Sequence, residues 1–145
     1  EPSMRIVFDE TFALPLDSVE SYFRTPADWV RLYGIAGEVE DRGDGWTAVP
    51  LAGFPFPLVA RVTRHEPGRC IVWVFRGFWK GRGEVAFEKT DTGGTRVRGF
   101  EEIAVRPLGP LSRVLESAFL ERRFRGIWAL GWRRLRRAAQ TGDAR

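Results

Sequence analysis

The segment from Gly37 to Arg106 constrains the fold more than any other feature, because closely spaced turn signals divide it into short strand-like pieces. The pieces are rich in β-branched and aromatic residues, which suit strands. Hairpins in succession give an antiparallel meander, and a further alternating strand is predicted over 5–14. The turn signals are at 43–45, 53–57, 67–68, 77–83 and 91–94, and the pieces between them read TAVPLA, LVARVTRHE, RCIVWVFR, GEVAFEKT and TRVRGFEEIAV.

Two short helices are predicted after the first strand. Residues 15–20 have the pattern of a helix start, with Asp17 as the cap and Glu20 reaching back from three positions on. Pro26 ends this helix. A second short helix is predicted at 27–33.

The period changes to helical after residue 108. Two apolar stripes occur there, and at 100° per residue they point about 160–200° apart, so one straight helix could not bury both. We therefore predict a short helix at 109–118, a kink at 119–121 and a long helix to about residue 139. The first stripe is Leu111, Val114, Leu115 and Ala118; the second is Leu120, Phe124, Ile127, Gly131, Leu135 and Ala138; and Arg122, Arg125, Arg133, Arg136 and Arg137 lie opposite the second.

The size and composition indicate one packed domain. The chain has 145 residues and is 43% hydrophobic, which is enough to build a core. We assign the domain to 4–140, with 1–3 as a cloning remnant and 141–145 as a C-terminal tail. Cys70 is the only cysteine, no run approaches a membrane span, and no signal peptide is recognised. The expected location is the cytoplasm, with no transmembrane segment.

Several segments resemble the START-like, or SRPBCC, superfamily, which includes polyketide cyclase/dehydrase and lipid-transport proteins. The resemblance implies an α+β helix-grip fold, in which a curved antiparallel sheet of about six or seven strands wraps around a long C-terminal helix. It also implies a cavity for lipids, polyketides or other apolar molecules, but no catalytic motif that could be transferred. The similar segments are 13–15 with Val19, 22–23, 25–26 and Trp29; 65–69; 83–88 with 93–97; and 107–111.

Strand parity predicts which side chains face the concave side of the sheet. We assign Ile71, Trp73 and Phe75 to the concave face of their strand. One alternating set of residues on each later strand is assigned to the same face, and this places Glu101 inward among apolar residues. The rings could line a cavity, or they could be ordinary core packing. The candidate cavity residues are Trp29, Tyr33, Phe56, Ile71, Trp73, Phe75, Phe87, Gly99, Glu101, Phe124 and Trp128.

Glu101 is the one candidate for chemistry. An ionised carboxylate among apolar residues is costly unless it is paired, so Glu101 would anchor a ligand or transfer a proton. Alternatively, it is solvated near a cavity mouth or paired with an arginine. Gly99 leaves space beside it or marks a bulge. A chain with one histidine, His65, and one cysteine supports no conventional zinc site, and no cofactor is predicted.

Three functions remain open. The first is binding or transport of a hydrophobic small molecule, and the second is a cyclase/dehydrase-like reaction that uses Glu101. The third is an interaction module, using either the arginine face of the last helix or the apolar loop at 53–57. The net charge of +4 is local, since seven arginines and one acid lie within 121–137. No specific nucleic acid partner is expected, and a homodimer is an open alternative.

Overall fold

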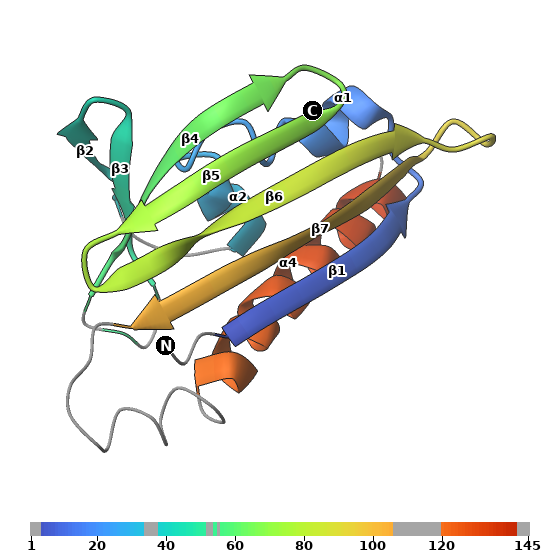
Figure 1. Ribbon diagram of the computed structural model, residues 1–145. Coiled ribbons are helices and arrows are strands. Elements are labelled where there is room, and N and C mark those ends of the chain that lie inside the picture. The colour runs from blue at the N-terminus through green and yellow to red at the C-terminus, as the bar shows by residue number, and fades with distance from the viewer. Residues whose placement is uncertain (1–3, 34–37, 52–53, 55, 106–119, 142–145) are drawn as a thin grey trace.

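The computed structural model describes residues 4–33, 38–51, 54, 56–105 and 120–141, and within them a seven-stranded antiparallel sheet carries three helices on one face (Figure 1). The sheet order is β1-β7-β6-β5-β4-β3-β2. This architecture confirms the predicted helix-grip class. The elements are β1 (Met4–Phe12), α1 (Leu16–Glu20), α2 (Trp29–Tyr33), β2 (Glu40–Gly43), β3 (Trp46–Val49), β4 (Leu58–Glu66), β5 (Cys70–Arg76), β6 (Trp79–Lys89), β7 (Thr95–Val105) and α4 (Glu121–Thr141).

The start of β6 differs from the prediction, which placed a turn over 77–83. The strand begins at Trp79, and Gly81 and Gly83 lie inside it. Gly83 is opposite Trp73 in the β5–β6 pair, and a Cβ atom added there would overlap the indole of Trp73. Glycine is therefore needed at this position for a close approach within the sheet, not for a turn.

Helix α1 is not held by the predicted capping box. Its N-cap residue is Pro15, which makes no side-chain cap, and Asp17 forms an ion pair with Arg24 at 2.6 Å. The buried Glu20 carboxylate accepts a hydrogen bond from the Gly68 backbone N–H at 2.8 Å. Because that N–H belongs to the β4–β5 turn, the prediction missed a long-range contact that fastens α1 to the sheet.

Helix α4 buries one stripe, as predicted, and runs to Thr141, slightly beyond the predicted end. Its buried residues are Phe124, Trp128, Gly131, Trp132 and Leu135. At Gly131 a Cβ atom would lie 2.9 Å from Leu32 Cγ of α2, so glycine lets these helices pack closely. The predicted helix at 109–118 lies outside the described residues, as does residue 119 of the predicted kink at 119–121.

Candidate functional site

The buried carboxyl group of Glu101 is the centre of the candidate site. The residue lies on β7 and is 2% exposed. Its Oε1 accepts a hydrogen bond from Trp128 Nε1 at 3.0 Å, and its Oε2 accepts one from Trp73 Nε1 at 3.3 Å. Three elements, β5, β7 and α4, therefore meet at one polar group.

The position of Gly83 explains how Trp73 reaches this carboxyl from two strands away. In the sheet register Trp73 is opposite Gly83, and Gly83 is opposite Glu101, so the three residues lie at one level of β5, β6 and β7. Because Gly83 has no side chain, the indole of Trp73 lies across β6 and its N–H meets Glu101. A side chain at 83 would block that path.

Gly99 allows the close approach of both a backbone carbonyl and a ring. It is opposite Phe8 in the β1–β7 pair, and a Cβ atom there would overlap the Glu84 carbonyl oxygen and lie 2.9 Å from Phe8 Cε2. Phe8 in turn stacks on Trp128, with ring centroids 4.7 Å apart. Glycines on β6 and β7 thus bring aromatic rings to both sides of Glu101.

Burial controls the charge of Glu101. Removal from water raises its pKa from 4.5 to about 7, and the hydrogen bonds from Trp128 and Trp73 oppose that rise. Within the described residues, none of the ion pairs includes Glu101. At 2% exposure the carboxyl group is not solvated, so that alternative is wrong, and within the described residues no arginine pairs with it. A group with a pKa near neutrality can both donate and accept a proton.

Most of the predicted cavity residues are buried in the same core cluster, but they are not all close to Glu101. Trp29 packs against Trp73 with centroids 5.2 Å apart, and Phe75 lies 6.4 Å from Trp29. Phe124 instead packs with Trp79, at 5.1 Å. The buried candidates are Trp29, Ile71, Trp73, Phe75, Phe87, Glu101, Phe124 and Trp128.

The two remaining side-chain candidates are Phe56 and Tyr33. Phe56 is 44% exposed and stacks on Phe78 with centroids 4.1 Å apart. Tyr33 ends α2, and its side chain lies outside the described residues. Phe54, two residues before Phe56, packs on Trp79 and Phe124. It therefore lies at the edge of the core.

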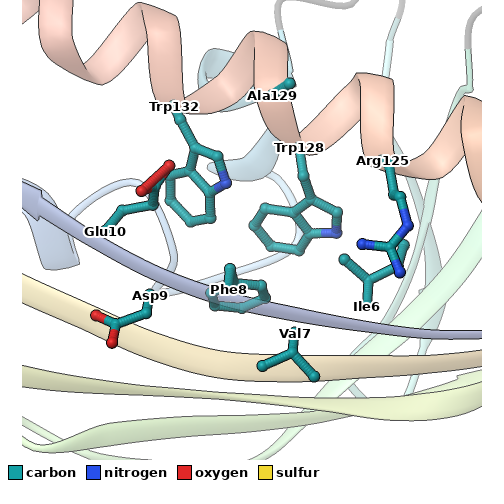
Figure 2. Close-up of a pocket in the computed structure, with 9 residues that line it drawn as sticks. All are labelled: Ile6, Val7, Phe8, Asp9, Glu10, Arg125, Trp128, Ala129 and Trp132. Atoms are coloured by element: carbon teal, nitrogen blue, oxygen red, sulfur yellow. The ribbon is translucent and has the colours of Figure 1, made fainter.

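An open groove of about 300 Å³ runs between β1 and α4. Figure 2 shows the β1 strand on one side and α4 on the other, with Phe8, Trp128 and Trp132 between them. Trp128 therefore lines the groove and also binds Glu101 through its N–H. The lining residues are Ile6, Val7, Phe8, Asp9, Glu10, Arg125, Trp128, Ala129 and Trp132.

The sequence analysis did not include Phe8, Gly83 or Trp132 in the site. No sequence signal indicated Gly83, because its alignment with Trp73 and Glu101 depends on the register of three strands. Trp132 lies outside the apolar stripe chosen for α4, yet it is 6% exposed and stacks on Trp128. The apolar stripe chosen for α4 did not indicate that the side chain of Trp132 turns toward the sheet.

The described residues contain no cluster of three or more metal-ligating side chains. Among their helices, none has the length and apolar character required to cross a bilayer.

Comparisons with known proteins identify the family and the fold. The profile of the family described as "Polyketide cyclase / dehydrase and lipid transport" matches residues 4–140. Comparison with curated protein sequences gave no match.

Similar solved structures share the fold at low identity. They include the Zhui aromatase/cyclase from Streptomyces sp. R1128, with 17% identity, a TM-score of 0.68 and coverage of 94% of this chain and 96% of that chain. The Aha1 dimer from Colwellia psychrerythraea has 13% identity, a TM-score of 0.69 and coverage of 96% and 98%. Protein SA2116 from Staphylococcus aureus, of unknown function, has 10% identity, a TM-score of 0.70 and coverage of 99% and 98%.

Proposed function

Because the chain belongs to the polyketide cyclase/dehydrase and lipid transport family, we propose that it binds an apolar small molecule beside Glu101, with the carboxyl group orienting the ligand. The observation that carries this proposal is a buried carboxyl whose hydrogen-bond donors, within the described residues, are two indole N–H groups. An apolar residue there would avoid the free energy that burying a carboxyl group costs. Local rules of core packing are most often broken where function requires it.

The geometry favours a ligand with a flat apolar body and one polar tip. A carboxylate has about four lone-pair positions, and the two indoles occupy two of them. Ionised Glu101 would accept a hydrogen bond from a hydroxyl or amine, and protonated Glu101 would donate one to a carbonyl. The faces of Trp29, Trp73 and Trp128 suit stacking against a planar ring. Trp29 packs on Trp73, and Trp128 packs on Phe8 and Trp132, so binding requires an indole to move aside.

A fluorescent probe tests this proposal. We expect 1-aminoanthracene, a flat molecule with one amine, to bind saturably and to quench tryptophan emission. Glu101→Gln should weaken binding about 3- to 10-fold, the value of one hydrogen bond. Glu102→Gln is the matched control, since Glu102 is the next residue on the opposite face and pairs with Arg82. Non-saturable binding, or equal affinity in the Glu101→Gln and Glu102→Gln variants, would overturn the proposal.

A cyclase/dehydrase-like reaction is the second candidate, and the burial of Glu101, which raises its pKa to about 7, is the observation that favours it. A carboxyl with that pKa can remove a proton next to a carbonyl and return it to an oxygen during ring closure. The enclosing rings would hold a reactive chain in one conformation. Unchanged turnover of an identified substrate by Glu101→Gln would exclude this role, whether or not the ligand-binding proposal holds.

A further inference from the structure

Within the described residues, strand β1 has one backbone edge that pairs with no other strand. It is the last strand of that sheet, and its partner there is β7. Arg125 Nη2 donates to the Arg5 carbonyl at 3.4 Å, so that carbonyl points away from β7. In an antiparallel pair, residues of one parity share this direction. The N–H and C=O groups of Val7 and Asp9 therefore point outward too, and in the described part of the chain no hydrogen bond to them is formed.

The groove between β1 and α4 runs along this edge. Five consecutive residues, 6–10, form one wall, which spans roughly 14 Å at 3.4 Å per residue. The rings of Phe8, Trp128 and Trp132 form an apolar floor (Figure 2). A groove between an edge strand and a helix is the geometry in which an extended peptide adds a strand: the edge supplies backbone hydrogen bonds, and the helix side supplies contacts for alternate side chains.

The helix wall of the groove is positively charged. Ala129 faces the groove, and Arg122 and Arg133 lie seven residues before and four residues after it, on the same side of α4. Neither arginine has an ion-pair partner within the described residues. On the strand wall, by contrast, the charges are already compensated, because Asp9 pairs with Arg96 at 2.7 Å and Glu10 with Arg136 at 3.3 Å.

This charge pattern decides between two occupants. If a second copy paired through its own β1, the two α4 helices would present their arginine sides to each other, which is unfavourable. An acidic segment would instead complement them. We propose that the groove between β1 and α4 binds an extended acidic segment of a partner protein, which adds a strand to β1 at Val7 and Asp9. Alternate apolar side chains contact Phe8, Trp128 and Trp132, and acidic side chains at the ends contact Arg122 and Arg133. This proposal does not depend on the ligand-binding one.

The test uses a synthetic peptide, acetyl-Glu-Thr-Leu-Thr-Leu-Thr-Glu-amide, whose glutamates and leucines lie on one face of a strand. Binding should shift the backbone amide NMR signals of Val7 and Asp9. Val7→Pro removes the outward N–H without removing a bond to β7, so the fold should persist and affinity should fall about 10-fold or more. Val7→Ala keeps the N–H and is the matched control, with unchanged affinity. A peptide with lysines in place of the glutamates should bind more weakly.

Three results would overturn the proposal. The first is the absence of shifts at Val7 and Asp9 with millimolar peptide. The second is equal affinity in the Val7→Pro and Val7→Ala variants, or for the acidic and lysine peptides. The third is self-association that Val7→Pro abolishes, measured by sedimentation, because the edge would then belong to a second copy of the chain.

Discussion

Titration of Glu101 should make the stability of this protein fall as the pH rises through neutrality. The pKa of Glu101 is about 7 in the folded chain and 4.5 in an unfolded one. The folded state therefore binds the proton more tightly, so the stabilising contribution is complete below pH 4.5 and is lost as the pH rises through about 7. At about 1.4 kcal/mol for each tenfold difference in proton affinity, the loss is about 3 kcal/mol.

The assay is urea unfolding from about pH 4.5 to pH 8.5, with wild type compared to Glu101→Gln. Other groups titrate alike in both proteins, so the difference between their free energies of unfolding isolates Glu101. Wild type should lose about 3 kcal/mol relative to the variant over this range. Glu102→Gln, which alters a partly exposed carboxylate on the opposite face, is the matched control variant. A constant difference between wild type and Glu101→Gln would refute the argument, since it would mean that folding leaves the pKa of Glu101 unchanged.

Two further predictions concern the surroundings of this carboxyl. Gly83→Ala should destabilise the fold by about 1–3 kcal/mol in thermal or urea unfolding, because the added methyl overlaps Trp73. Gly126→Ala is the control, since nothing lies within 4 Å of the added atom. It should stabilise α4 by up to about 1 kcal/mol. Equal effects of the two substitutions would contradict the packing argument. Trp128→Phe removes one hydrogen-bond donor to Glu101, so the pKa of Glu101 should rise further. The pH at which half of the stability loss has occurred should then be higher than in wild type. An unchanged midpoint would mean that this hydrogen bond does not stabilise the carboxylate.

Periodicity and turn signals predicted the strands and the long helix, because each piece between 37 and 106 had one apolar parity and a clear stop. The helix-grip arrangement of these elements came from the family resemblance. The predicted strand boundary was wrong where glycine has two structural roles. Gly81 and Gly83 were interpreted as a turn, although a strand also needs glycine where a ring crosses it. The cap at Asp17 failed for a related reason, since Glu20 found a partner in a distant turn. Local patterns do not contain such contacts.

The site could be predicted only in part. Parity correctly turned Glu101 toward the interior, because alternation along β7 continues through 95–103. The hydrogen-bond partners of Glu101 depend on two features that the sequence of one strand does not specify. The first is the register of three neighbouring strands, which aligns Trp73 with Gly83 and Glu101. The second is the rotation of α4 about its axis, which brings the indole of Trp128 to the carboxyl. Hydrophobicity alone could not supply that rotation, since α4 has aromatic and aliphatic residues at several angles.

Trp128 joins the two proposed sites, and this has a testable thermodynamic consequence. Its ring lines the groove beside β1, while its N–H stabilises the ionised form of Glu101. A peptide that moves this indole away from Glu101 would raise the pKa of the carboxyl, and by linkage it would bind more tightly at low pH than at high pH. A peptide that leaves the indole in place would bind equally well on both sides of pH 7. Peptide affinity should be measured at about pH 6 and pH 8, in wild type and in Glu101→Gln, to separate these cases. A pH dependence of affinity that persists in Glu101→Gln would show that the two sites are not coupled through Trp128.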